Sequence, residues 1–384
     1  MSPQFTILIP CLNEEKTLGV CIEKAWQGLK DAGVGGEVLI VDNGSTDSSV
    51  EIAVQHGCKV IHVVEKGYGS ALMSGIQNAS GDFVIMGDAD DSYDFLEIPK
   101  FVEPLMAGAD FVQGCRFGNG GVIRKGAMPF LHQWWGNPMF SFLARAWFGA
   151  PVHDIYCGMR GFRKDFQQRL RQKCTGMEFA VEMMIKASLA KARITEVPIT
   201  LHPDGRDGRP PHLRTFQDGW RTLRFFLMCS PTWLFLIPGI GLILLGVIGA
   251  GLAIPGLKIG PATFDVHTLL FASLGFLLGY QSIFFALVAK SFAITEGFIP
   301  KDATLAGFFH FATLERGLVL GLIIVLGGLL MLLSEVLLWI HGGFGPMDYS
   351  RTMKWVIPGA TLTALGFQTV FFSFLVSMMG ISRK

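Results

Sequence analysis

Two patterns of apolar residues divide this chain into two parts. In the first part, short apolar runs alternate with longer stretches in which apolar residues recur with helical spacing. This alternation predicts a doubly wound parallel β-sheet with helices on its faces, and hence an α/β fold up to about Cys115. The expected strands are Phe5–Ile9, Glu37–Val41, Lys59–Val63, Phe83–Met86 and Asp110–Gln113.

Four long apolar stretches follow Arg224, and each is long enough to cross a bilayer as a helix. Half of the 384 residues are apolar and 32 are Phe, which is more than one soluble domain accommodates. Nearly all of this excess lies after Arg224. The pattern predicts an all-α membrane domain over residues 231–384, with transmembrane helices at Trp233–Ile254, Val266–Ala289, Gly317–Ile340 and Val356–Ile381.

Two stretches ahead of the spans mix aromatic and basic residues. Residues 128–148 include Trp134 and Trp135 beside His132 and Arg145, and we expect a helix that lies in the membrane interface. A helix of the soluble core is the alternative. Residues 213–230 place three arginines beside aromatic residues, which is typical of an amphipathic connector against anionic headgroups. The remaining residues, 1–212, form the expected cytosolic domain.

The distribution of lysine and arginine predicts the orientation of the spans. Met1–Gln4 leads directly into a strand, so we expect no signal peptide and a cytosolic N-terminal domain. Basic residues favour the same side: Lys290, Lys301, Arg316, Arg383 and Lys384 would face inward, against Lys258, Arg351 and Lys354 outward. We therefore expect an integral, multi-pass protein of the inner (cell) membrane with both termini in the cytosol.

Cysteine usage and net charge narrow the class further. All seven cysteines precede the first span and none forms a Cys-x-x-Cys pair, so we expect reduced cytosolic thiols without a disulfide framework or a zinc site. The formal net charge of +1 averages a polar domain with an almost uncharged one. We expect no nucleic-acid partner.

The apolar run Phe83–Met86 ends in a cluster of carboxylates, Asp88, Asp90 and Asp91. Ligands of open α/β sheets bind at the carboxyl ends of the strands. Two aspartates one residue apart can hold one divalent cation and leave positions for diphosphate oxygens. The alternative is a surface turn whose aspartates cap the next helix, Phe95–Met106.

Two further strands end in small polar residues, which we expect at the same sheet edge. The first is followed by Pro10-Cys11-Leu12-Asn13-Glu14 and the second by Asp42-Asn43-Gly44-Ser45-Thr46-Asp47. Carbonyls and carboxylates can accept the N–H and hydroxyl groups of a nucleoside, and Gly44 allows close approach of the backbone. The alternative is that Asn13 and Asp47 only cap helices.

Together with Lys66-Gly67-Tyr68-Gly69 and Asp88-Ala89-Asp90, these motifs resemble the inverting family 2 glycosyltransferases. Within that family the chain is most similar to polyprenyl-phosphate (dolichol-phosphate) sugar synthases, over about residues 5–230. The resemblance implies a GT-A-like, Rossmann-like fold that binds a nucleotide-sugar, a Mg²⁺ or Mn²⁺ ion on the Asp-x-Asp pair, and a polyprenyl phosphate acceptor in the membrane.

The resemblance also assigns roles to individual residues. Nucleoside and donor contacts are implied for Pro10, Leu12, Glu14, Val41, Asp42, Asn43 and Lys66. Contacts to the diphosphate and its metal are implied for Asp88, Ala89 and Asp90. Ser92 stands where these synthases often have a glutamine that also binds the metal. The third protein ligand is therefore open between Asp91 and Asp94.

Four more residues belong to the implied catalytic set. Arg116 resembles the family's arginine that lies against the substrate phosphates, a role that its forked guanidinium suits. Glu182 is either an active-site residue or half of a structural ion pair. Arg206 and His212 have the spacing of an arginine and a lysine that close over the donor diphosphate, with Arg209 and Arg214 as substitutes. Asp154–Arg160 resembles another family segment, Asp-Pro-Thr-Ser-Gly-Phe-Arg.

The implied reaction is a single inverting displacement. An oxygen of polyprenyl phosphate attacks the anomeric carbon of a UDP-hexose, which we expect to be UDP-glucose, and the nucleoside diphosphate leaves. The product, a polyprenyl-phosphate sugar, would form on the cytosolic face. Whether copies associate as a homo-oligomer is open.

Two other functions compete with this one. A processive polysaccharide synthase would need a pore, for which four spans are few, and the Gln-x-x-Arg-Trp acceptor motif of those enzymes is not found in the sequence. A non-catalytic translocator or scaffold for lipid-linked sugars would give a purpose to Glu335 inside the third span. That carboxylate could instead reach the outer interface.

Overall fold

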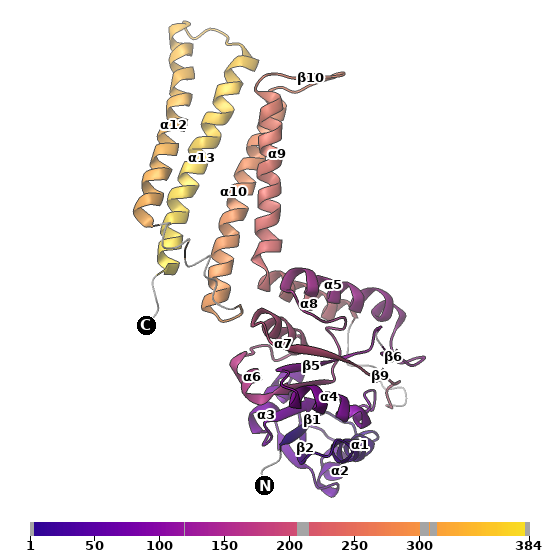
Figure 1. The fold of residues 1–384 in the computed structure, drawn as a ribbon. Helices are drawn as coiled ribbons and strands as arrows, with labels where there is room; N and C mark the ends of the chain where they lie inside the picture. Colours follow the sequence, from indigo (N-terminus) through magenta and orange to yellow (C-terminus); the bar gives the residue numbers. More distant parts are fainter. Residues whose placement is uncertain (1–3, 119, 206–214, 300–306, 308–312, 381–384) are drawn as a thin grey trace. The chain divides into compact units, whose positions relative to one another are not determined.

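The computed structural model describes residues 4–118, 120–205, 215–299, 307 and 313–380. The chain forms two compact units, Met1–Phe226 and Leu227–Lys384, which are described here separately. The first combines a β-sheet with helices, and the second is helical apart from one short β-ribbon (Figure 1).

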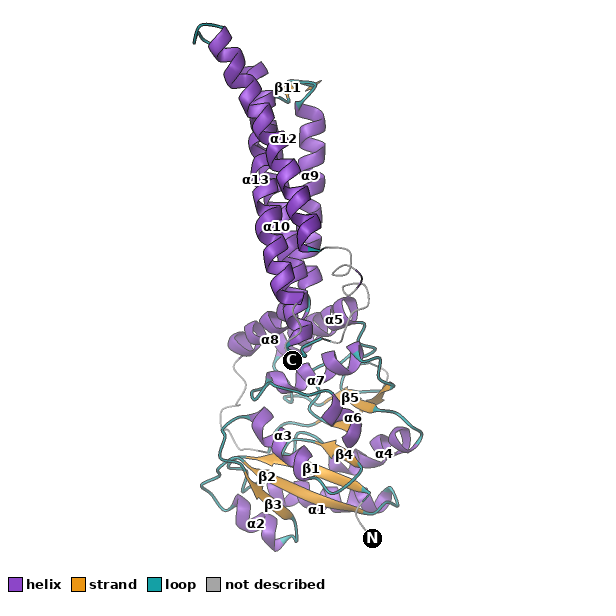
Figure 2. Ribbon diagram, turned by 90° about the vertical axis from the view of Figure 1, so that its left-hand side faces the viewer, coloured by secondary structure: helices purple, strands orange, loops and turns teal. Residues whose placement is uncertain are grey.

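The first unit is built around a seven-stranded sheet with the order β3-β2-β1-β4-β7-β5-β8. The central strands are buried apolar runs, as expected for a sheet that is covered on both faces (Figure 2). The five strands expected from the sequence all form. They are β1 (Phe5–Cys11), β2 (Gly36–Asp42), β3 (Lys59–His62), β4 (Phe83–Met86) and β5 (Phe111–Cys115). Two later strands, β7 (Arg160–Arg163) and β8 (Ile194–Pro198), complete the sheet.

The five expected strands run in the same direction, as predicted, but the whole sheet is mixed because β7, which lies beyond them in the sequence, runs the opposite way. This strand runs antiparallel to both of its neighbours, and its first residue, Arg160, pairs with Met86 of β4 and Gln113 of β5. An antiparallel strand starts at the edge where its neighbours end. Residues 154–159 are therefore brought to the carboxyl edge of β4 and β5.

Helices cover both faces of this sheet. On one side lie α1 (Leu18–Asp31), α2 (Ser49–Gln55) and α4 (Ile98–Met106), preceded by the turn η1 (Phe95–Glu97), and on the other α3 (Tyr68–Asn78) and α7 (Glu178–Leu189). Side chains of β1 alternate between the faces: Ile7 packs in the core of the α1 side, and Leu8 faces Gly75 of α3. The unit also contains the helix α6 (Lys164–Arg169) and a small two-stranded sheet of β6 (Val122–Ile123) and β9 (Thr200–Leu201).

The two aromatic stretches form helices within the described residues. The first is a π-helical turn, η2 (His132–Gly136), that continues into α5 (Asn137–Phe148), and the second is α8 (Thr215–Cys229). Phe226 of α8 stacks on Phe140 and Phe148 of α5, at centroid distances of 5.7 and 5.3 Å. Large apolar side chains remain exposed on both, among them Phe130, Trp134, Trp135, Phe142 and Trp220. This exposure suits the interface better than a soluble core.

Among its described residues, the second unit contains four helices that are long and apolar enough to span a membrane, the number expected from the sequence. They are η3 with α9 (Thr232–Leu236 and Ile237–Ala253), α10 (Val266–Thr295), α12 (Leu314–His341) and α13 (Tyr349–Gly380). The last one begins at Tyr349, ahead of the expected Val356, and continues through Pro358. A ribbon of β10 (Lys258–Ile259) and β11 (Ala262–Thr263) connects α9 to α10.

Glycines allow close approach between the helices of this unit. A Cβ on Gly246 of α9 would lie 2.9 Å from the carbonyl oxygen of Ala272 in α10, and one on Gly328 of α12 would lie 2.6 Å from that of Gly359 in α13. Such close backbone contact is the usual means by which helices associate where water does not drive them together. Glu335 of α12 is 9 % exposed in this packing.

Candidate active site

The carboxyl edge of β1, β2 and β4 gathers the polar loops that the sequence singled out. The loop after β1 is hydrogen-bonded to the loop after β2. The backbone N–H of Asn13 donates to Ser45 Oγ (3.0 Å), and the side-chain Oδ1 of Asn13 accepts from the Thr46 N–H (2.7 Å). Thr17 joins the same loop to the carboxylate cluster through a hydrogen bond from its Oγ1 to the Ala89 carbonyl (2.7 Å). These motifs therefore meet in space.

Asp88 and Asp90 lie directly after β4, and both are partly exposed. Asp88 Oδ1 accepts a hydrogen bond from the Tyr68 hydroxyl at 2.9 Å. Burial, aided by the charge of Asp88, raises the pKa of Tyr68 well above its ordinary value, so this hydroxyl stays protonated and donates. Asp90 Oδ1 accepts from Ser92 Oγ (2.6 Å) and the Ser92 N–H (3.1 Å). Ser92 thus orients Asp90.

Asp91 and Asp94 both face a lysine. Lys24 Nζ of α1 lies 2.8 Å from Asp91 Oδ1 and 3.8 Å from Asp94 Oδ1. Asp94 Oδ1 also caps η1 by accepting from the Leu96 N–H at 3.1 Å. An ammonium group competes with a cation for these carboxylates, so the geometry favours Asp88 and Asp90 as the metal pair.

The Asp-x-Asp pair fits a magnesium or manganese ion that also binds a substrate. Among the residues that the structure describes, no three His, Cys, Asp or Glu side chains form a group that could hold a metal ion. Mg²⁺ is commonly bound through one or two carboxylates, with substrate phosphates and water at the other positions. Two carboxylates such as Asp88 and Asp90 would therefore suffice as protein ligands where a diphosphate completes the coordination.

Asp42 and Asn43 at the end of β2 are buried and hydrogen-bonded within the protein. Asp42 Oδ1 accepts from the Ser45 N–H (2.8 Å) and Oδ2 lies 3.0 Å from His62 Nδ1. Burial acts to raise the pKa of Asp42, but the hydrogen bonds from Ser45 and His62 outweigh it and lower that pKa. Asp42 is therefore a carboxylate near neutral pH and can accept from a base or ribose.

The other expected nucleoside and donor contacts differ in what they present. Pro10 and Leu12 are partly exposed at the edge, and Glu14 is buried beside Thr17. Lys66 is exposed, and its Nζ reaches back to the Asn43 carbonyl at 2.8 Å. Val41 and Ala89 are buried, and the Ala89 carbonyl already accepts the hydrogen bond from Thr17.

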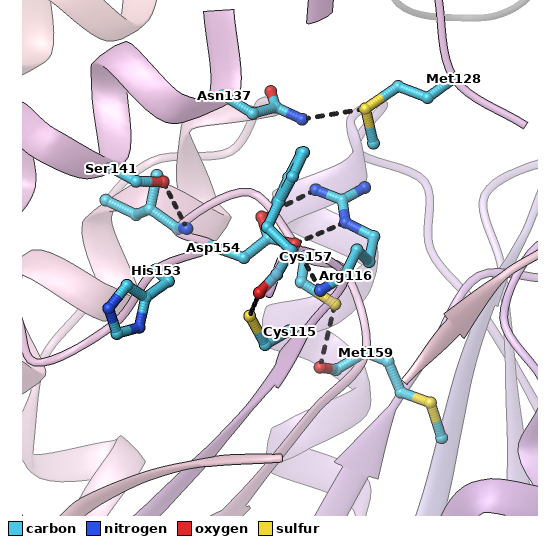
Figure 3. A network of polar contacts seen from close by, with 12 residues as sticks. Cys115, Arg116, Met128, Asn137, Ser141, His153, Asp154, Cys157 and Met159 are labelled. Carbon is cyan, nitrogen blue, oxygen red and sulfur yellow. Dashed lines mark hydrogen bonds and ion pairs between the residues drawn. The ribbon is translucent and has the colours of Figure 1, made fainter. Parts of the chain in front are cut away.

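Arg116 forms a buried bidentate ion pair with Asp154 (Figure 3). Its Nε lies 2.6 Å from Asp154 Oδ2 and its Nη2 lies 2.9 Å from Oδ1. Arg116 is 7 % exposed and Asp154 is fully buried. Burial alone would lower the pKa of Arg116, but the Asp154 carboxylate more than offsets this, and the pKa is raised well above its ordinary value. The arginine therefore carries a fixed charge in a fixed orientation.

A second layer of contacts holds Asp154 and the segment around it. Glu196 of β8 accepts from the backbone N–H groups of His153 (2.7 Å) and Asp154 (3.1 Å). The Gly158 N–H donates to the Tyr93 hydroxyl at 2.8 Å, and Arg116 Nη1 lies 3.5 Å from the same oxygen. Tyr93 thus links Arg116 to the segment that precedes β7.

Arg160 is fully buried and organises backbone. Its guanidinium donates to the carbonyls of Cys157 (2.8 Å), Ile155 (2.7 Å) and Ala180. Asp154, Arg160, Tyr93 and Glu196 were not assigned roles from the sequence. The resemblance of Asp154–Arg160 to a family segment was the only signal that pointed to any of them.

Glu182 forms an ion pair with Lys186, which is one of the two roles that the sequence left open for it. It is fully buried, its Oε1 lies 2.8 Å from Lys186 Nζ, and its oxygens accept from the N–H groups of Lys173 (3.0 Å) and Cys174 (2.8 Å). Lys186 Nζ also donates to the Arg171 carbonyl. Glu182 therefore fixes the loop that precedes α7.

We expect Glu182→Gln to lower stability and to leave most of the transfer rate of the folded protein. Lys186 would lose its charged partner in a buried site, which costs about 3–5 kcal/mol. Thermal denaturation in detergent and the rate per folded molecule measure the two effects separately. Glu182→Gln combined with Lys186→Met should recover stability. An unchanged melting temperature together with a lost rate would restore the catalytic assignment.

Two expected residues cannot be placed, because Arg206 and His212 lie outside the described residues, as do Arg209 and Arg214. The described chain immediately before them contacts the carboxylate cluster. The Gly205 N–H donates to the Asp90 carbonyl, and the His202 N–H donates to the Ser92 carbonyl, both at 2.9 Å.

The cysteines in these motifs are not activated nucleophiles. Cys11 of the first loop is buried, and burial raises its pKa to about 11. Burial likewise raises the pKa of Cys157 to about 12. All seven cysteines are free thiols.

Family models match both parts of the chain. Residues 6–171 match glycosyl transferase family 2, and residues 287–380 match the glycosyltransferase family 2 C-terminal transmembrane region. The two matches fall in the two compact units.

Several characterised or solved proteins are similar to this chain. The low-salt glycan biosynthesis hexosyltransferase Agl6 of Haloferax volcanii is 36% identical over 382 residues, which cover 99% of this chain and 90% of that protein. The dolichyl-phosphate hexose transferase of the same organism is 33% identical over 199 residues, or 50% of this chain and 80% of that protein. A crystal structure of glucosyl-3-phosphoglycerate synthase from Mycobacterium tuberculosis has a TM-score of 0.47 at 21% identity, covering 59% and 79% of the two chains.

Proposed function

The chain belongs to glycosyltransferase family 2, with a C-terminal transmembrane region, and we propose that it transfers one hexose from a nucleotide-sugar to polyprenyl phosphate with inversion. The observation that carries this proposal is the Asp88–Asp90 pair at a sheet edge where polar loops from β1 and β2 meet, in a chain that is itself an integral membrane protein. A relative described as a dolichyl-phosphate hexose transferase supports the choice of acceptor.

Each part of the edge has a task in this reaction. Asp42 and the backbone of the first two loops would accept hydrogen bonds from the nucleoside, and Asp88 and Asp90 would hold Mg²⁺ or Mn²⁺ with the donor diphosphate. When bound, that ion would neutralise charge on the leaving diphosphate. Arg116, Arg206 and His212 would add positive charge to the same group.

The acceptor phosphate is already anionic, so the reaction needs no strong general base. One of its oxygens forms a bond to the anomeric carbon, and the bond from that carbon to the diphosphate oxygen breaks. The exposed aromatic side chains of η2, α5 and α8 would hold the first unit at the lipid surface, where the acceptor is concentrated. The basic residues between spans favour a cytosolic active site and cytosolic termini.

A donor and acceptor panel tests this proposal. The full chain in nanodiscs is given labelled UDP- and GDP-hexoses with polyprenyl phosphate, in Mn²⁺, Mg²⁺ or EDTA. We expect one donor, UDP-glucose first, to yield a lipid that carries a single inverted hexose, and EDTA to lower the rate about 10²-fold. A polymer product would identify a processive synthase. Absence of transfer, with movement of preformed lipid-linked sugar across liposomes, would identify a translocator.

A further inference from the structure

The hydroxyl of Tyr68 contacts one of the two carboxylates proposed to bind the metal. Tyr68 is the first residue of α3, and its hydroxyl donates to Asp88 Oδ1 at 2.9 Å. On the other side, a Cβ on Gly158 would lie 2.9 Å from Asp88 Oδ2, so the backbone of the segment before β7 adjoins that oxygen. The orientation of the Asp88 carboxylate is therefore set by two neighbours from different parts of the chain.

The backbone that carries Tyr68 is held on one side by Asn43. Asn43 Oδ1 accepts from the Gly67 N–H at 2.8 Å, and its Nδ2 donates to the carbonyls of Glu65 (2.8 Å) and Val63 (3.3 Å). Its side-chain amide is thus hydrogen-bonded to the loop that leads into α3. Asn43, for which the resemblance implies a nucleoside contact, thus holds the backbone that leads to Tyr68.

The same backbone is held on the other side by the loop before α7. The Ser70 N–H donates to the Thr175 carbonyl at 3.1 Å, and a Cβ on Gly69 would lie 2.5 Å from the Cys174 carbonyl oxygen. Glu182 accepts from the Cys174 N–H and so fixes this loop. Only glycine at 69 permits so close an approach of two backbones.

We propose that Tyr68 is a positioning residue for the metal site, which fixes the Asp88 carboxylate, and that Asn43 acts through it. The inference rests on the proposed function in one respect, that Asp88 binds a divalent cation with a nucleoside diphosphate. Residues that hydrogen-bond metal ligands commonly change metal affinity or activity 10- to 100-fold when they are removed. Tyr68 would therefore act on metal binding rather than on nucleoside recognition.

The test measures Mn²⁺ binding to the full chain in nanodiscs in the presence of UDP. The EPR signal of free Mn²⁺ reports how much of the ion is bound. We expect Tyr68→Phe to weaken Mn²⁺ binding about tenfold, because it removes the hydroxyl and keeps the ring. The melting temperature should stay close to that of the wild type. Tyr349→Phe is the matched control, because it also removes a tyrosine hydroxyl, but from an exposed position at the start of α13. This variant should leave Mn²⁺ binding unchanged.

A second variant keeps the inference testable if Tyr68→Phe is poorly folded. Asn43→Ser should shift Mn²⁺ binding in the same direction, and the two changes together should weaken it no more than the larger single change. A role in base recognition alone would instead weaken UDP binding without metal. Mn²⁺ affinity within twofold of the wild type in Tyr68→Phe overturns the inference.

This readout separates the inference from the proposed function. If the wild type binds Mn²⁺ with UDP but transfers no sugar to polyprenyl phosphate, the proposed acceptor is wrong and the shift in Tyr68→Phe still decides the role of Tyr68. If the wild type binds Mn²⁺ with neither UDP nor GDP, both proposals are overturned.

Discussion

Replacement of Asp88 or Asp90 by asparagine is expected to lower sugar transfer by about 10²-fold or more, while the fold is kept. Each change removes one negative charge from the pair that would hold the cation, so the leaving diphosphate loses its stabilisation. A 10²-fold loss corresponds to about 2.7 kcal/mol of the activation barrier. The rate is measured at several Mn²⁺ concentrations, since a variant with weakened metal affinity recovers partly at high Mn²⁺.

Two other aspartates test whether the loss of rate is specific to Asp88 and Asp90. Asp91→Asn should retain most of the rate, because the Asp91 carboxylate forms an ion pair with Lys24. If Asp91→Asn is as inactive as Asp88→Asn, then Asp91 is the third metal ligand that the sequence left open. Asp31→Asn, an exposed change at the end of α1, is the control for loss of a carboxylate. Full metal-dependent transfer by Asp88→Asn or Asp90→Asn would rule out the metal site.

Asp154→Asn is expected to lower the free energy of unfolding of the first unit by about 3–5 kcal/mol. The change leaves the Arg116 guanidinium buried without its charged partner, and removal of one member of a buried pair has a cost of this size. For a domain of this length it lowers the melting temperature by about 10 °C. Thermal denaturation followed by circular dichroism in detergent measures it.

The exposed pair Arg163–Asp165 is a matched control for this prediction. Arg163 Nε and Nη2 bind Asp165 at 3.1 and 3.0 Å, so the geometry is also bidentate, but the side chains are 38% and 56% exposed. Asp165→Asn should therefore change stability by about 1 kcal/mol or less. The double variant Arg116→Met with Asp154→Leu should recover stability without activity if Arg116 also binds phosphate. Equal effects of Asp154→Asn and Asp165→Asn would contradict the argument.

Much of the fold was predictable because its elements have strong local signals. The five apolar runs from Phe5 to Gln113 and the four spans after Arg224 are continuous, and burial in a sheet or a bilayer requires little beyond that continuity. Strand β7 was missed because Arg160-Gly161-Phe162-Arg163 is short, carries two arginines and has no alternation of apolar and polar residues. Its burial depends on carbonyls that satisfy the Arg160 guanidinium, two from the segment just before the strand and one from Ala180 in α7.

Site residues divide in the same way. Asp88, Asp90 and Asp42 were identifiable because a parallel strand and its polar ending are adjacent in sequence, and parallel strands end at one edge. The contacts between distant segments could not be identified in this way. Tyr68 is 20 residues from Asp88 in the sequence, and Asp154 is 38 residues from Arg116. Glu182 binds a loop eight or nine residues away, and that loop in turn contacts α3.

Hydrophobic periodicity and length are local properties, so the sequence was enough to predict an α/β domain followed by four membrane spans. The contacts of Asn43, Arg116 and Glu182 follow from the packing of distant segments instead. The antiparallel β7 brings Asp154 and Gly158 to the edge beside Arg116 and Asp88, and the loop before α7 fixes the backbone of Tyr68. Such contacts join segments far apart in the chain, and no local pattern records them.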